Sequence, residues 1–272
     1  DFTKTTAFNT LVLGAATTAT LDTLFKTAGF TSITGSSGID ALTFGTTVAP
    51  VVSINGGGGA DTIATGANGS TLTIADTDGI AVTGGDGADA LTFTTALTAT
   101  TITGAAGIDT ITLAGSVSNV ATVIGGTGVD VINLGASHIG GVTFTATADA
   151  IPSSTTADAV ITNYIKALDK ISATALVVGV QTATAGAGVA TITGGVATFN
   201  AADTTFAQHL AAVAKALQLT AGATAIWQEG ADAYVYNADA VLDVAATDTL
   251  IQLVGVTAGT LTTPTLNVLT IG

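Results

Sequence analysis

The sequence predicts an all-β fold: a right-handed parallel β-roll or β-helix solenoid, followed by a mostly antiparallel β domain that contains one helix and caps the solenoid. Three observations lead to this prediction. A glycine-rich turn that ends in aspartate recurs through the first half of the chain. Short strands that alternate apolar residues with Thr flank the copies. The composition, with 34 Gly and 5% aromatic residues, favours strands joined by tight turns.

The repeat is clearest in residues 55–63, where a run of glycines leads to Asp61 and then to Ile63. Its form is G-G-x-G-x-D-x-U-x, with U a large apolar residue, a pattern typical of calcium-binding parallel β-helices. Successive repeat aspartates are 21, 28, 20 and 21 residues apart. These aspartates are Asp40, Asp61, Asp89, Asp109 and Asp130. The near-constant period predicts one coil per repeat, with two strands and two turns in each.

One strand follows each repeat aspartate, as in residues 90–93, and a second strand precedes each later repeat, as in 80–83. Alternation along these strands places one set of side chains inside and the Thr set outside. The 28-residue spacing indicates an enlarged coil, in which Asp76 and Asp78 could form a further ion site, although a plain polar turn is favoured there. With one motif turn per coil, the ions are expected along a single edge of the roll.

Calcium takes six to eight oxygen ligands at about 2.3–2.6 Å. Gly turns supply backbone carbonyls, because Gly accepts positive φ, and Asp adds short carboxylates. The alternative is a purely structural turn, with Gly for geometry and Asp for a turn hydrogen bond; five copies in register favour several bound calcium ions. The candidate ligands are Gly35, Gly38, Asp40, Gly56, Gly57, Gly59, Asp61, Gly84, Gly85, Gly87, Asp89, Gly104, Gly107, Asp109, Gly125, Gly126, Gly128 and Asp130.

Metal binding is expected to be coupled to folding. Without metal, carboxylates ~4.8 Å apart on neighbouring coils repel by roughly 1 kcal/mol per pair even in water. A bound cation reverses the sign of that interaction, so binding free energy becomes folding free energy.

Three segments are predicted: residues 1–33 as a leading solenoid coil, 34–150 as the calcium-binding β-roll, and 151–272 as the C-terminal cap. Within the last segment, residues 205–217 are predicted to form an amphipathic helix with a capping box of Thr205 and Gln208. Hairpins are predicted around Gly194-Gly195 and across residues 229–232. A terminal cap is expected because a solenoid otherwise leaves an open apolar end.

The chain has few charged residues, and most of them are acidic. The chain carries 18 Asp, Glu229, five Lys and no Arg, for a net charge of −14. Nucleic acid and anionic membrane surfaces are therefore excluded as partners, since both require basic residues. The absence of Cys excludes disulfides and thiolate chemistry, and the absence of Met predicts a fragment or a processed product.

No catalytic constellation is present, so the chain is not expected to be an enzyme. The motifs H-E-x-x-H and G-x-S-x-G are absent, and His138 and His209 stand 71 residues apart. The repeated carboxylates share one environment, whereas acid–base catalysis needs two different ones. The aromatic residues Trp227, Tyr234 and Tyr236 could form a sugar-binding patch, but packing in the core of a hairpin is favoured.

The repeats of residues 34–135 resemble those of the RTX family of calcium-binding bacterial proteins secreted by type I systems. The likeness continues in residues 160–171, where Asn163 replaces the Asp usual in that family. Residues 227–235 and 248–256 are similar to the end of RTX surface-layer proteins of the Caulobacter type. The copies at Asp40 and Asp109 depart from the motif because each lacks its second Gly.

The resemblance implies a structural component of a bacterial surface layer, secreted to the cell surface through an uncleaved C-terminal signal. Implied partners are further copies in a calcium-held lattice, the type I secretion ABC transporter, and a cell-surface polysaccharide bound through a missing N-terminal part. Two alternatives stay open: the RTX and secretion tail of an extracellular protease or lipase, and the terminal region of a large RTX adhesin.

Overall fold

The computed structural model describes residues 9–113, 121–136, 138, 141–145, 147, 152, 157–173, 176–179, 188–217, 220–239, 244–265 and 267–272. It confirms the predicted all-β class, with a parallel β-solenoid and a mostly antiparallel region that contains one helix. The chain divides into two compact units, residues 1–142 and 143–272, which are described separately.

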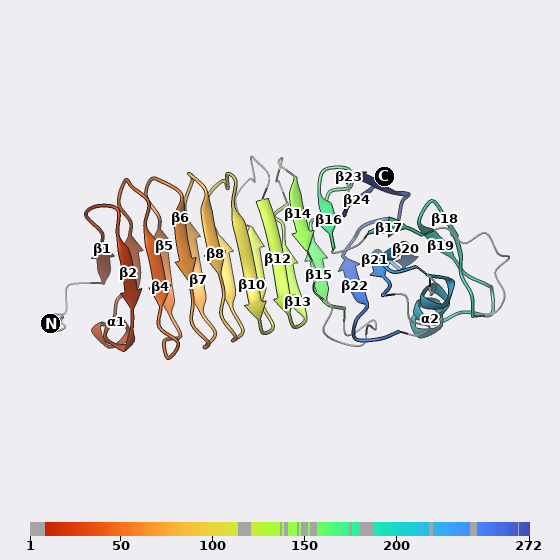
Figure 1. The fold of residues 1–272 in the computed structure, drawn as a ribbon, viewed down its shortest axis with the longest axis horizontal. Helices are drawn as coiled ribbons and strands as arrows, with labels where there is room; N and C mark the ends of the chain where they lie inside the picture. The colour runs from red at the N-terminus through yellow and green to blue at the C-terminus, as the bar shows by residue number, and fades with distance from the viewer. Residues whose placement is uncertain are drawn as a thin grey trace. The chain divides into compact units, whose positions relative to one another are not determined.

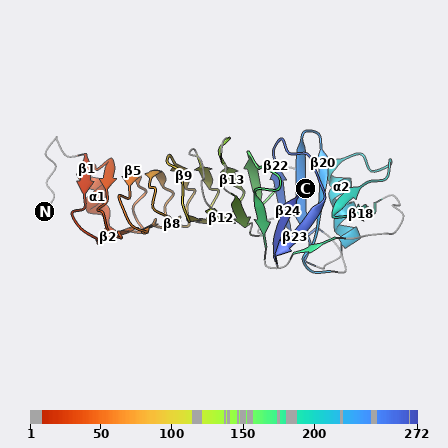
Figure 2. The same cartoon turned by 90° about the horizontal axis from the view of Figure 1, so that it is seen from above.

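The first unit is a stack of coils in which successive strands alternate between two parallel sheets (Figures 1 and 2). One sheet contains, in spatial order, β1 (Thr10–Val12), β3 (Ser32–Thr34), β5 (Val51–Asn55), β7 (Thr71–Ala75), β9 (Ala90–Phe93), β11 (Thr110–Leu113) and β13 (Asp130–Asn133). The other contains β2 (Thr18–Leu21), β4 (Ala41–Phe44), β6 (Asp61–Ala64), β8 (Ile80–Thr83), β10 (Thr101–Ala106) and β12 (Ala121–Thr127).

The core between the sheets is built from in-register ranks of apolar side chains. One rank runs through five neighbouring strands and consists of Ile33, Ile54, Ile74, Phe93 and Leu113, all buried. Burying each such side chain contributes about 1.5–3 kcal/mol. The alternation of apolar and polar residues therefore fixes the register, since a one-residue slip would expose the whole rank.

The outward face of the odd-numbered sheet presents hydroxyl groups at the positions between these core residues. A rank across six strands consists of Thr10, Ser32, Ser53, Thr73, Thr92 and Thr112. None of these side chains is charged, so this rank is neutral although the chain as a whole carries a net charge of −14, and the exposed Val12 and Val51 lie beside it on the same face.

The expected enlarged coil between Asp61 and Asp89 is wrong. Three ordinary strands, β6, β7 and β8, lie between these two aspartates, where β4 and β5 alone separate Asp40 from Asp61. Strand β7 has the same alternation as its neighbours, with Leu72 and Ile74 buried between exposed threonines. The 28-residue spacing thus contains an additional half coil.

The leading segment contains the short helix α1 (Thr23–Ala28). Phe25 stacks on Phe30 at a ring-centroid distance of 5.3 Å and meets Phe44 edge-on at 5.7 Å. These rings close the core where the helix connects β2 to β3.

The second unit contains two groups of strands. One group has the order β15 (Ala159–Thr162), β22 (Thr249–Leu253), β21 (Asp232–Asn237), β20 (Ala223–Glu229), β19 (Val196–Thr198) and β18 (Thr191–Thr193), with β17 (Val177–Val178) also paired to β20. The other has the order β14 (Val142–Thr145), β16 (Lys170–Ser172), β24 (Val268–Ile271) and β23 (Leu261–Thr265). The hairpins β18–β19 and β20–β21 confirm the two predicted ones.

Helix α2 (Phe206–Leu217) is amphipathic, as predicted, and packs its apolar face against side chains of β18 to β22. Its capping box is present: the Gln208 amide donates to Thr205 Oγ1 at 3.3 Å, and the Thr205 amide donates to Gln208 Oε1 at 3.0 Å. Trp227 and Tyr236 are fully buried, which confirms that the aromatic residues of the β20–β21 hairpin belong to the core.

Candidate metal centre

The repeat turns lie on two different edges of the solenoid. We call the turns that lead from the odd-numbered sheet to the even-numbered sheet the first edge, and the reverse turns the second edge. Asp40 and Asp61 belong to the first edge, whereas Asp89, Asp109 and Asp130 belong to the second. The expectation of ions along a single edge is therefore wrong, because strand β7 moves every later repeat by half a coil.

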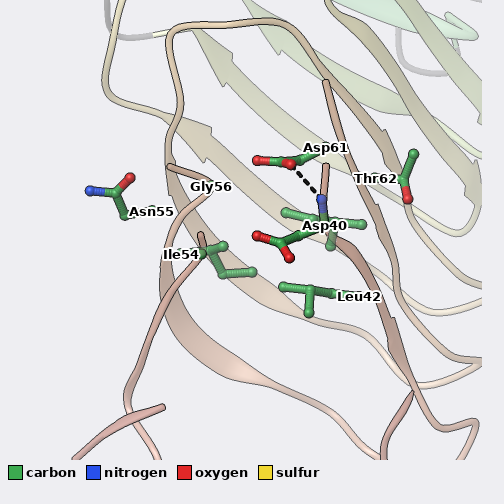
Figure 3. A pocket seen from close by; sticks show the side chains of 9 residues that line it. Asp40, Leu42, Ile54, Asn55, Gly56, Asp61 and Thr62 are labelled. Atoms are coloured by element: carbon green, nitrogen blue, oxygen red, sulfur yellow. Dashed lines mark hydrogen bonds between the residues drawn. The ribbon is translucent and has the colours of Figure 1, made fainter. Parts of the chain in front are cut away.

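Along each edge, the carboxylate of a repeat aspartate accepts the backbone amide of the equivalent residue one coil earlier. On the first edge, Asp61 Oδ1 accepts from the Asp40 amide at 2.8 Å (Figure 3). On the second edge, Asp109 Oδ1 accepts from the Asp89 amide at 2.8 Å, and Asp130 Oδ1 accepts from the Asp109 amide at 3.0 Å. The repeat aspartates thus hydrogen-bond successive coils together.

The second carboxylate oxygens fall into two groups. Asp40 Oδ2 accepts the Ser36 amide at 2.7 Å, and Asp89 Oδ2 accepts the Gly85 amide at 3.0 Å. In contrast, Oδ2 of Asp61 and Oδ2 of Asp109 are buried and accept no hydrogen bond within the described residues. An ionised oxygen in that position is costly unless a proton or a cation compensates it.

Burial raises the pKa of Asp61 and of Asp109 to about 6, from an ordinary value of 3.8. The amide hydrogen bonds that these carboxylates accept oppose the rise in pKa. A side-chain hydrogen bond with Asp76 and the negative charges of Asp76 and Asp40 add to the rise in pKa at Asp61, and the negative charge of Asp89 adds to the rise at Asp109. The two sites consequently favour bound positive charge, whether a proton or a metal ion.

The first glycine of each motif is required by the aspartate five residues later. A methyl carbon at Gly56, Gly104 or Gly125 would lie 2.3–2.4 Å from Oδ2 of the aspartate in the same turn. Real side-chain carbons do not approach oxygen so closely. The glycine therefore leaves the space that the carboxylate occupies, and the two residue types recur together for this reason.

The third glycine of the motif is required by coil stacking. A methyl carbon at Gly128 would lie 1.7 Å from the Gly107 carbonyl oxygen of the preceding coil, and the backbone at Gly128 has φ +116°. At the second motif position of the Asp109 copy, Ala105 replaces Gly and has φ +82°. This positive φ is strained for Ala and suits Gly, which has φ +96° and +103° at the same position in Gly57 and Gly126.

A cavity of about 10 Å³ lies between the first two motif turns of the first edge, lined by Gly35, Asp40, Asn55, Gly56 and Asp61 among others (Figure 3). Its size is near the minimum that can contain one water molecule. Both carboxylates of this pair, Asp40 and Asp61, border the space.

These features fit a hard cation such as calcium. The unpartnered carboxylate oxygens and the backbone carbonyl oxygens of the stacked glycine turns are the kinds of oxygen ligand that calcium prefers. Within the described residues, no three side chains of His, Cys, Asp or Glu converge, so backbone carbonyls would have to complete any such site.

The structure brings together the candidate ligands of neighbouring copies on each edge, and it separates the first-edge set from the second-edge set. One carboxylate outside the candidate set joins the first edge: Asp76, in the turn between β7 and β8. It is buried, and its Oδ2 also accepts no hydrogen bond among the described residues. The sequence signal was present in Asp76-Thr77-Asp78-Gly79, a turn whose first residue lies 20 residues after Gly56.

The two histidines have structural partners. His138 Nδ1 lies 2.8 Å from the Gly135 carbonyl oxygen. His209 contacts Glu229 and stacks on Phe199 at a ring-centroid distance of 4.0 Å. The His138 contact is local to the turn after β13, whereas the His209 contacts attach α2 to β20 and to the residue that follows β19.

No protein-family model matches this chain, and no curated protein matches it either. Among the described residues, no helix is both long and apolar enough to cross a membrane.

Proposed function

We propose that this chain is a structural part of a bacterial surface layer of the RTX type, which binds calcium at its stacked turns and assembles with further copies of itself. On this proposal it has no enzymatic activity and reaches the cell surface by type I secretion. The observation that carries the calcium part is the pair of buried, unpartnered carboxylate oxygens of Asp61 and Asp109.

Bound calcium would supply the positive charge that these carboxylates lack. The protein's own part is to hold the oxygens in place: amides of the preceding coil fix Oδ1 of Asp61 and Asp109, and each first glycine leaves room beside Oδ2. Ionised carboxylates would then favour stacking of coils instead of opposing it.

The neutral hydroxyl face of the odd-numbered sheet supports self-association. Thr73 and Thr92 are paired in register on this face, and the whole rank is uncharged. A chain with a net charge of −14 is repelled by its own copies at long range; contact through a neutral face, with calcium at the turns, reduces that repulsion.

The proposal is tested with the purified chain in EDTA, in millimolar calcium and in millimolar magnesium. Circular dichroism is expected to show a gain of β-structure with calcium and a smaller effect of magnesium, because magnesium prefers a stricter octahedral site. Electron microscopy is expected to show sheets or ordered arrays in calcium. An unchanged β spectrum would contradict the calcium part. Stable monomers at high concentration in calcium would contradict the lattice and favour a secretion tail of an enzyme or an adhesin.

A further inference from the structure

The turn between β7 and β8 lacks the glycine-rich motif but lies directly beside a motif turn. Asp76, in this turn, faces Gly56 of the preceding first-edge turn. A methyl carbon at Gly56 would lie 1.8 Å from Asp76 Oδ2 and 2.4 Å from Asp61 Oδ2. The two carboxylate oxygens are therefore no more than 4.2 Å apart, which is the sum of those two distances.

Both carboxylates are held firmly through their other oxygen. Asp61 Oδ1 accepts the Asp40 amide at 2.8 Å, and Asp76 Oδ1 accepts the Asp78 amide at 2.9 Å. The backbone of Asp76 is fixed as well, because its amide donates to Thr95 Oγ1 at 2.9 Å and its carbonyl accepts from the same hydroxyl at 2.6 Å. Rotation of either side chain away from the other would break the hydrogen bond that its Oδ1 accepts.

The facing oxygens have no donor other than a proton shared between the two carboxyl groups. Each aspartate is 3% exposed, and Oδ2 of each accepts no hydrogen bond among the described residues. Two ionised carboxylates at this separation repel strongly when buried. Oxygens no more than 4.2 Å apart can, however, both reach one calcium ion at the usual 2.3–2.6 Å.

We infer that Asp61 and Asp76 together bind one divalent cation, calcium by the chemistry of its ligands, between a motif turn and a turn without the motif. This inference rests on the proposed calcium binding and adds to it a ligand that the repeat does not contain. Backbone carbonyls and water complete the coordination, and Asp78, exposed in the same turn, adds negative charge nearby.

The experiment counts calcium ions per chain by equilibrium dialysis. Asp76→Asn is expected to bind one ion fewer than the wild type, and so is Asp61→Asn. The double variant is expected to lose no more than that same single ion. Asp22→Asn, which removes the same charge from an exposed position outside the repeat turns, is the matched control and keeps the full number.

Thermal unfolding shows whether a variant loses its calcium ion only because the chain does not fold. In EDTA, Asp76→Asn is expected to melt no lower than the wild type, because its amide can donate to Asp61 Oδ2. In calcium it is expected to melt lower. If Asp76→Asn changes the melting temperature relative to the wild type by the same amount in EDTA and in calcium, the two carboxyl groups share a proton instead of a metal ion. That result would overturn the inference.

Two outcomes separate this inference from the proposed function. If the wild type binds calcium and assembles, but Asp76→Asn retains every ion or the double variant loses two, only the shared site is wrong. If the wild type binds no calcium, the calcium part of the proposed function is wrong together with the shared site.

Discussion

At the scale of single residues, the motif is explained by mutual steric demands as well as by ligand chemistry. The first glycine makes room for a carboxylate, and the third makes room for a carbonyl of the preceding coil. The aspartate accepts an amide from the preceding coil. The sequence predicted which residues form the turns, because spacing and residue type suffice for that. It did not predict the Asp61–Asp76 contact, since Asp76 lies outside the motif and only coil stacking brings it close.

Gly104→Ala is expected to destabilise the chain by about 1–3 kcal/mol, the usual range for overpacking. The new carbon would lie 2.3 Å from Asp109 Oδ2 and 2.2 Å from the Gly125 carbonyl oxygen, and both neighbours are fixed by the coil stack. Gly14→Ala is the control, because no heavy atom lies within 4 Å of a carbon added there. Denaturant unfolding compares the two variants; equal stability would contradict the steric argument.

At the scale of elements, the alternating strands beside the repeat aspartates were predicted, whereas β7 and β23 are among the strands that were not. Strand β7 was missed because the coils were counted from one repeat aspartate to the next, although Leu72 and Ile74 alternate with threonines like any other pair. Strand β23 contains Pro264 and ends its group of strands. Proline disfavours a strand except at an edge, so sequence pattern alone argues against it.

Helix α2 allows a prediction for the second unit. Thr205→Ala is expected to cost about 1 kcal/mol of stability, the typical value for loss of an N-cap side chain, because the Gln208 amide loses its acceptor. Thr204→Ala is a suitable control, since Thr204 donates to Gln208 Oε1 through its backbone amide, which the substitution keeps. Thermal unfolding of both variants measures the difference, and a larger loss in Thr204→Ala would argue against the capping role.

At the scale of the whole molecule, the all-β class and the solenoid followed from a short repeat at constant spacing. The sequence could not predict which edge each repeat occupies, because spacing alone does not distinguish an enlarged coil from an added strand. Composition gave the acidic character, whereas the neutral rank of hydroxyl groups on one sheet face depends on the register between strands.

The pH dependence of stability is expected to change sign with calcium. Asp61 and Asp109 have pKa values raised to about 6 in the folded chain, against 3.8 ordinarily. Their contribution to stability in EDTA is therefore complete below about pH 4 and is lost as the pH rises through 6. The melting temperature in EDTA should rise when the pH falls from 7 to 5. In calcium it should fall over the same interval, because metal ligands must be deprotonated.

The control for this prediction is the double variant Asp61→Asn, Asp109→Asn, which should lose most of the pH dependence in EDTA. A wild-type melting temperature in EDTA that drops on acidification to pH 5 would show that other groups dominate.

The half coil formed by β7 has a consequence for how such a chain can change in length. Each strand of the solenoid needs only a parallel neighbour on either side, and both sheets accept the same alternating pattern. A deletion that removes one strand and one turn would therefore leave the stack intact and transfer every later turn to the opposite edge. Variation in length by an odd number of strands would redistribute charge around the axis of the solenoid without a change of fold.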